Sequence, residues 1–473
     1  MKLLKLSLVA VSLFLGSTLA FASNFADTYG FSTQGIALGN AMTARVNDWS
    51  SVYYNIAGLG RTAHMKTLPA GVIADEEDPK SDSKKKDSDT DQHSYINDLS
   101  ITYLRSMTAL DININRTDSE GDPLSTDGDD LGSYGFAIIG LAVDLNLIYK
   151  MPSFISSARF GLGAGLNDDM TVAKLNDIDM RTHNFLRYGR ECQKITAFAG
   201  IGLGFLDDMF GFGAGANVGA GGEGTVLLGN VNMESTPQNP DGQSKMDLKA
   251  KPSLVAGLYI SPGQLFSPLK GFDIGASYRQ ESYMEIYPFK TSAMAMDDSV
   301  VMNMVVAILD YYSPDIYTAG MAYSRWGFTL SADIEYHQWS KYKINASNQI
   351  NLTDLPELND IIVYRTGLEY QLISWVSLMI GAYYQPSFIS DQAEAGLYNL
   401  LDNDKYVGSA GAKIGLPRMF GFGGPVDITV AYQYQYLVKN TVVKDSSAVS
   451  SYNPNYNYGG IVQNFAVGLC LKL

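Results

Sequence analysis

Residues 328–337 read FTLSADIEYH, and the stretch alternates between apolar and polar side chains from one residue to the next. Successive side chains of a β-strand point to opposite faces, so the alternation predicts a strand with one apolar and one polar face. The same pattern recurs along the chain, at 272–279, 362–372, 426–436 and 465–473. The repeated pattern indicates an all-β protein.

The length of these strands separates a membrane barrel from a soluble β-sandwich, which would also alternate. The alternating runs extend over about 10 to 15 residues, whereas strands of globular proteins average about 5 or 6. Tyrosines gather near the strand ends, and the polar faces are rich in Gly, Ala and Ser. Both features are typical of a barrel with aromatic girdles and a crowded lumen. Backbone groups in a bilayer must all be paired, so the sheet is expected to close.

The N-terminus has the three parts of a secretory signal. Lys2 and Lys5 precede an apolar run from Leu6 to Leu15, and Ala20-Phe21-Ala22 offers a cleavage site. We expect residues 1–22 to be a signal peptide, because the apolar run is shorter than the roughly 20 residues that a membrane helix needs. Export then places the barrel in the outer membrane of a Gram-negative bacterium.

Composition excludes several function classes. The 473 residues carry 34 Lys and Arg against 49 Asp and Glu, a formal charge of −15, which argues against a nucleic-acid partner. Two cysteines and four histidines leave little material for a disulfide framework or a metal site. Asp122, Asp127, Asp129 and Asp130 do not have the spacing of an EF-hand, so a solvated loop is favoured over calcium binding. We expect no cofactor and no metal.

The lengths of the connections suggest fourteen antiparallel strands, with short turns on the periplasmic side and long loops outside. The first strand is placed at 62–73 and the last at 459–473. Tyr95–Met107 also resembles a strand, but counting it would give an odd number, so it is assigned to a first outer loop. A short helix is expected in 391–402. The barrel is thus assigned to residues 62–473.

Residues 23–61 do not alternate, yet they contain several aromatic side chains, which favours a plug inside the barrel over a disordered tail. The stretches Gly30-Phe31-Ser32-Thr33-Gln34-Gly35, Gly39-Asn40-Ala41 and Asn55-Ile56-Ala57-Gly58-Leu59 resemble the N-terminal hatch of the FadL family. The residues that carry this hatch motif are Gly35, Gly39, Asp48, Asn55, Ile56 and Ala57. Ile56 departs from the family, which usually has proline there, and proline would fix φ and remove an N–H donor.

The FadL family consists of outer-membrane transporters of long-chain fatty acids and hydrocarbons. The resemblance therefore implies passive uptake of a hydrophobic molecule, which is held above the hatch and released sideways at the third strand. In this chain Gly161, Gly163 and Gly165 share one face of that strand. They provide either a lateral opening or room for the hatch, and the sequence leaves both readings open.

Charged side chains on the polar faces are expected to form ion pairs across the lumen. Arg159, Arg279 and Arg365 are also candidates to bind a fatty-acid carboxylate, because guanidinium and carboxylate groups pair in bidentate fashion. The alternatives are a general diffusion porin and an outer-membrane lipase, but a porin would lack a plug, and no serine elbow accompanies His337. We expect a monomer that is not an enzyme, surrounded by outer-membrane lipid and lipopolysaccharide and inserted by the barrel assembly machinery.

Overall fold

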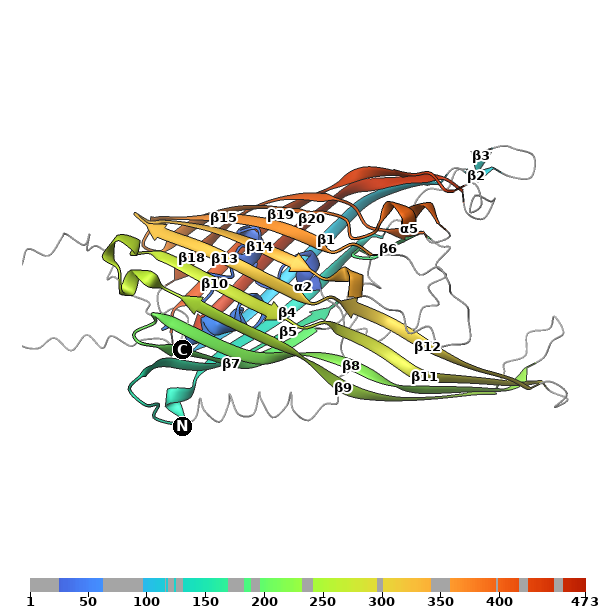
Figure 1. Ribbon diagram of the computed structural model, residues 1–473, viewed down its shortest axis with the longest axis horizontal. Helices are drawn as coiled ribbons and strands as arrows, with labels where there is room; N and C mark the ends of the chain where they lie inside the picture. Colours follow the sequence, from blue (N-terminus) through green and yellow to red (C-terminus); the bar gives the residue numbers. More distant parts are fainter. Residues whose placement is uncertain are drawn as a thin grey trace, which may run out of the picture.

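The computed structural model describes residues 25–62, 97–114, 116–117, 123–124, 131–168, 183–188, 196–231, 241–295, 301–341, 358–396, 399–416, 424–445 and 454–473. Most of these residues lie in one closed β-barrel (Figure 1). Among them, no helix is long and apolar enough to cross a membrane. The predicted signal peptide and the four aspartates considered for calcium lie outside the described residues.

The barrel is a ring of fourteen antiparallel strands, which confirms the predicted fold class. Each ring strand pairs with the ring strands before and after it in the chain, β8 with β9 for example, and the pairing of β1 with β20 closes the ring. The ring strands are β1 (Asp98–Ile114), β4 (Ser133–Asp144), β5 (Ile155–Asn167), β7 (Thr196–Phe205), β8 (Phe210–Val231), β9 (Asp241–Ile260), β10 (Phe272–Arg279), β13 (Ile316–Arg325), β14 (Phe328–His337), β15 (Ile361–Ile373), β16 (Val376–Gln385), β18 (Lys405–Leu416), β19 (Val426–Val442) and β20 (Tyr456–Lys472).

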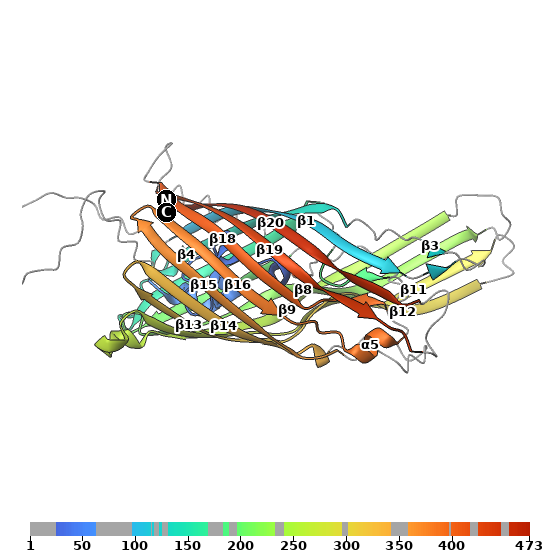
Figure 2. The same ribbon diagram turned by 90° about the horizontal axis from the view of Figure 1, so that it is seen from above.

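Two further strands extend the sheet beyond the ring. β11 (Ser282–Ala295) and β12 (Val301–Ser313) form a hairpin that follows β10 and precedes β13. β11 pairs in parallel with the outer half of β8. Together with β8 and β9, the hairpin projects well beyond the rest of the barrel at the end opposite the C-terminus (Figure 2).

The first strand was assigned wrongly from the sequence. Tyr95–Met107, which was placed in an outer loop, belongs largely to β1, and β1 pairs with β20 on one side and β4 on the other. β1 thus takes the place in the ring that was predicted for a strand at 62–73, and residues 63–73 lie outside the described residues. The predicted number of ring strands is correct, but β1 was left out of the predicted set.

The alternation that defined the strands sets their two faces. On β14, Leu330 and Ile334 are exposed on the outside, whereas Ser331, Asp333 and Glu335 are buried inside. The outer face thus carries large apolar side chains around the whole ring, as a lipid-facing surface requires. The pattern assigned these faces correctly.

The short connections lie together at one end of the barrel. β13 and β14 are joined by Trp326 and Gly327 alone, which have φ values of 53° and 79°. Positive φ at both positions is typical of the type I′ turns that suit twisted hairpins. Asn97, just before β1, exchanges backbone hydrogen bonds with Leu473, so both ends of the barrel chain lie at this short-turn end.

This arrangement predicts which positions are exposed on the cell surface. Ser374 lies in the exposed turn between β15 and β16, and Asp445 is exposed beyond the outer end of β19. We expect a cysteine at Asp445 to react with a membrane-impermeant maleimide on intact cells. A cysteine at Ser374 should react only after the outer membrane is permeabilised, and the opposite pattern would contradict the assigned orientation.

Short helices fill the interior at the height of the ring (Figure 1). They are α2 (Phe25–Thr28), α3 (Thr33–Ala37), α4 (Ser51–Tyr54) and the 3-10 helix η1 (Ile56–Gly60). η1 packs on β5, β7, β8 and β9, and α3 packs on β16, β18, β19 and β20. We call residues 25–62 the hatch; the division of the chain into signal, hatch and barrel stays a prediction.

The remaining elements lie in the connections. The strand pairs β2 (Arg116–Thr117) with β3 (Pro123–Leu124) and β6 (Asn184–Phe185) with β17 (Leu400–Leu401) belong to outer loops, and α5 (Asp391–Ala395) confirms the helix expected in 391–402. The 3-10 helices are η2 (Leu145–Leu147), η4 (Pro262–Gln264), η5 (Ser267–Leu269) and η6 (Trp339–Lys341).

Candidate functional site

The hatch motif consists of positions where the backbone must approach another group closely. A Cβ at Gly35 would overlap the Tyr54 side chain, whose hydroxyl accepts hydrogen bonds from the N–H groups of Phe31 and Ser32. Gly39 has a φ of +61° and lies against Ala382 on the wall. Gly35 is required because a side chain would collide with Tyr54, and Gly39 is required because its φ is positive.

The other motif residues hold the end of the hatch. The Asn55 side chain accepts from the N–H of Ala57 at 3.2 Å, and its amide donates to Leu258 O of β9 at 3.0 Å. Asp48 accepts from the N–H and the hydroxyl of Ser50. Ile56 is fully buried, and its side chain lies beside Gly200 of β7 and Gly215 of β8. In place of a rigid proline, this chain has an apolar contact with the wall.

Arg159 attaches the hatch to β5. Its side chain is fully buried, its Nε donates to Leu59 O at 2.8 Å, and its Nη2 donates to the carbonyls of Asn47, Gly58 and Arg61 at 2.6, 3.2 and 2.9 Å. Four hatch carbonyls thus surround the guanidinium. The arrangement assigns Arg159 a role in holding the hatch, whereas its predicted carboxylate-binding role stays untested.

The glycines of the third strand face the hatch. A Cβ on Gly161 would meet Val52 and Leu59, one on Gly163 would meet Phe31, and one on Gly165 would meet Phe25. Throughout this region β5 stays in unbroken register with β4 and β7. The three glycines therefore make room for hatch side chains in this conformation, and a lateral opening would require hatch and strand to separate.

Arg279 and Arg365 lie above the hatch and already have partners. Arg279 pairs with Asp27 at 2.8 Å and stacks over Tyr53 at 4.2 Å. Arg365 pairs with Glu335 at 3.0 Å, and Glu335 also contacts His337. Ion pairs are thus present inside the barrel, one between neighbouring strands and one from the wall to the hatch, although two guanidinium nitrogens of Arg365 have no hydrogen-bond partner among the described residues.

An aromatic cluster fills the interior between the hatch and the outer loops. Phe25 of the hatch stacks on Phe136 of β4 with ring centroids 4.8 Å apart, and Phe31 meets Phe198 edge-on at 5.5 Å. Phe185, Leu401, Tyr456 and Tyr458 continue the same apolar core toward the outer end. This aromatic cluster is the candidate binding region for an apolar molecule, because it is the apolar part of the barrel interior among the described residues.

Lys405, which the sequence analysis did not single out, lies at the border of the aromatic cluster. Its side chain is 1% exposed, and its Nζ lies 3.4 Å from the hydroxyl of Tyr188. The acids whose charges act on Lys405, Asp402 and Asp27, are already paired with Arg187 and Arg279. Among the described residues Lys405 forms no ion pair, so a positive charge on this buried amine beside an apolar region is costly without an anion.

Outer loops cover the aromatic cluster. β6 and β17 pair in parallel, and Trp339 stacks flat on Phe388 with centroids 3.9 Å apart. The carboxylate of Glu394 accepts hydrogen bonds from Asn440 and Tyr458, and burial raises the pKa of Glu394. Burial also lowers the pKa of Lys444 to about 8, and its ammonium donates to Glu394 O and Gly396 O. We call residues 183–188, 386–396 and 399–404 the lid.

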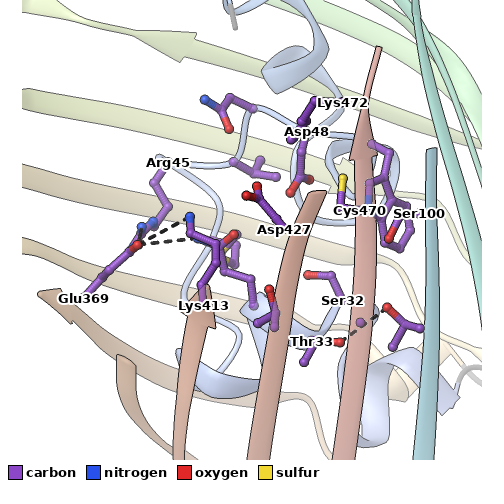
Figure 3. Close-up of a pocket in the computed structure, with 18 residues that line it drawn as sticks. Ser32, Thr33, Arg45, Asp48, Ser100, Glu369, Lys413, Asp427, Cys470 and Lys472 are labelled. Carbon is purple, nitrogen blue, oxygen red and sulfur yellow. Dashed lines mark hydrogen bonds and ion pairs between the residues drawn. The ribbon is translucent and has the colours of Figure 1, made fainter. Parts of the chain in front are cut away.

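A polar chamber lies on the short-turn side of the hatch (Figure 3). It encloses about 280 Å³ between the hatch and the inner faces of β1, β15, β18, β19 and β20. Glu369 lies between two cations, with Arg45 on the hatch and Lys413 on β18. Asp48, Asp427 and Lys472 add further charges. An apolar molecule would be poorly solvated in this polar chamber.

Comparisons with known proteins agree with this architecture. No family model matches the sequence. Over 457 residues, covering 91% of this chain and 88% of the relative, the sequence is 23% identical to alkane uptake protein A of Marinobacter nauticus. The crystal structure of a Pseudomonas aeruginosa FadL homologue matches 93% of this chain and 98% of its own, with a TM-score of 0.52 and 14% identity. The toluene transporter TodX of P. putida gives a TM-score of 0.49 at 12% identity.

The chain is thus a transmembrane β-barrel of the kind found in outer membranes, and it has the fold of the FadL homologue. The resemblance to the FadL family that the hatch motif indicated is confirmed in the fold, while the sequence similarity along the chain is to the alkane uptake protein.

Proposed function

We propose that the protein is an outer-membrane transporter of a Gram-negative bacterium, which takes up long-chain fatty acids or hydrocarbons by passive diffusion. The observation that carries this function is the aromatic cluster enclosed by the lid, the hatch and a closed barrel. Its apolar surface stabilises an apolar guest by about 25 cal/mol per Å² removed from water. The name of the M. nauticus relative supports the same class of substrate.

Release is proposed to be lateral, through the wall near β5. The polar chamber supports this route, because an apolar ligand that left along the barrel axis would have to cross a space lined by charges. A lateral exit also delivers the ligand to lipid rather than to water. The protein works as a monomer without catalysis, after insertion by the barrel assembly machinery.

The alternatives receive less support. A porin needs an open lumen, whereas here the hatch fills the ring. A lipase needs a histidine near lipid and beside a serine, whereas His337 is 2% exposed and its Nε2 contacts Glu335 inside the barrel.

The proposed function is tested by uptake in cells that lack the gene. Uptake of radiolabelled hexadecane and oleate at low concentration should fall several-fold and recover when the gene is restored. Proteoliposomes should not swell in sugar solutions, which would identify a porin. Unchanged uptake of both compounds in the deletion strain would contradict the proposal.

Lys405 provides a separate prediction about which ligand is preferred. If the ligand is a fatty acid, the buried ammonium pairs with its carboxylate while the tail occupies the aromatic cluster. Lys405→Met keeps the volume and removes the charge, so oleate binding should weaken about tenfold, equivalent to 1.4 kcal/mol. Hexadecane uptake should stay unchanged.

The matched control is Lys341→Met, which removes a half-exposed lysine paired with Asp315 outside the aromatic cluster. It should affect neither compound. Equal loss of oleate and hexadecane in Lys405→Met would show that the lysine supports the structure rather than a head group.

A further inference from the structure

A groove crosses the outer, lipid-facing surface of β15, β16, β18 and β19, away from the aromatic cluster. Its volume is about 570 Å³, within the range of roughly 300–1,000 Å³ found for small-molecule sites. The floor consists of small outward-facing residues that are neighbours across the strands, Thr366, Ala382 and Gly408. Tyr434 of β19 lies opposite Gly408 and closes one end.

Larger side chains border this floor on both sides. Toward the outer end, Tyr364, Tyr384, Tyr406 and Tyr436 form an unbroken row across the four strands. Toward the short-turn end, Leu368 and Ile380 form the opposite border. Over β15 and β16 the groove is therefore one residue pair high, and it runs across neighbouring strands, which lie about 4.8 Å apart. This shape suits an extended hydrocarbon chain.

Neither the backbone conformation nor the space around residue 408 requires a glycine there. A Cβ built on Gly408 would have no atom within 4 Å, and its φ is not positive. Most glycines of the ring, in contrast, face the hatch or a neighbouring backbone. The absence of a side chain at 408 leaves the groove floor open toward the surrounding lipid.

The outer rim offers polar groups that the described chain does not use. Tyr364, Tyr406 and Tyr436 are 52%, 58% and 47% exposed, and their hydroxyls have no hydrogen-bond partner among the described residues. Lys439 is exposed and follows Val438, whose N–H donates to Asp404 O beside the rim. Asp404 itself already accepts from Tyr384 and Ser387. Among the described residues, three hydroxyls and the ammonium of Lys439 thus remain available on the rim.

We propose that this groove is a binding site for a phosphorylated glycolipid of the outer leaflet, with an acyl chain lying over Gly408 and a phosphate at Lys439. Basic side chains next to a membrane surface bind phosphate head groups, and tyrosines at the interface bind with their hydroxyls toward the polar layer. The inference rests on the outer-membrane placement proposed above. It does not depend on which molecule the barrel transports.

Native mass spectrometry of the purified full-length barrel tests the site with defined lipids. After delipidation and incubation with lipid A, phosphatidylethanolamine or phosphatidylglycerol, the wild type should retain one lipid A. Gly408→Leu fills the groove and should reduce this retention at least fivefold, and Lys439→Gln should reduce it more modestly. Ala410→Leu, one outward-facing position farther along β18 and outside the groove, is the control and should bind like the wild type.

Three results would overturn the proposal: equal retention by Gly408→Leu, equal retention of the phospholipids, or a groove-dependent dimer in place of bound lipid. Hexadecane uptake by the Gly408→Leu variant should equal that of the wild type. Loss of lipid binding with intact uptake therefore concerns this site alone, whereas absent uptake in the wild type would contradict the proposed function instead.

Discussion

Arg159→Met is expected to free the hatch while the barrel stays folded. Four backbone carbonyls of the hatch accept hydrogen bonds from the Arg159 guanidinium in a fully buried position. Methionine leaves these carbonyls without that donor, and each unsatisfied buried group costs about 1–3 kcal/mol. The loss of several kcal/mol weakens the binding of the hatch to the barrel wall. The barrel itself is not weakened, because the hydrogen bonds between β5 and its neighbouring strands are made by the backbone.

Three measurements check this expectation. Trypsin should cleave the variant within the hatch, at Arg45 or Arg61, far faster than the wild type. Conductance in planar bilayers should rise as the lumen opens, and the heat-modifiable mobility of the folded barrel should persist. Arg325→Met, at an exposed turn position, serves as the control. A variant as protease-resistant as the wild type would contradict the anchoring role of Arg159.

Gly163→Phe is expected to reduce uptake at least tenfold, and a second substitution reveals why. A Cβ at Gly163 would lie 2.6 Å from Phe31 Cε1 and 3.1 Å from Val52 Cγ2, so a phenyl ring must displace hatch side chains. The backbone pairs of Gly163 with Gly140 and Phe198 remain available, so the barrel should assemble. The loss could then arise from a blocked lateral exit or from a displaced hatch.

The double variant Gly163→Phe with Phe31→Ala distinguishes these causes. Removing the Phe31 ring provides space for the new one, so a displaced hatch would return to its seat and uptake would recover. If β5 provides the exit, the passage stays blocked and uptake stays low. Gly408→Phe, at a glycine with open space around it, should transport normally. Full transport by Gly163→Phe alone would exclude an exit at this strand.

The sequence determined those features of the protein that depend on neighbours along the chain. A period of two assigns each side chain to a face, so the inward positions of Asp333, Glu335 and Arg365 followed from the alternation. The hatch motif was recognisable because its glycines satisfy local demands of backbone and space. The shared face of Gly161, Gly163 and Gly165 followed from the same period.

Tertiary structure decided the features that depend on pairing between distant segments. β1 is the first strand because it closes the ring against β20, a contact between residues more than 300 positions apart, and alternation could not rank it against 62–73. The two segments of the lid are likewise joined by a two-residue pairing of β6 with β17, which are far apart in the sequence.

The same reason governs the charged residues. Arg159, Arg279 and Arg365 look equivalent in sequence, yet one is surrounded by hatch carbonyls and two pair with acids. No sequence pattern singles out Lys405, because it lacks an ion-pair partner only where the acids near it in the fold, Asp402 and Asp27, pair with arginines. Periodicity places a charge inside the barrel, but only the closed ring with its hatch and lid decides whether that charge has a partner.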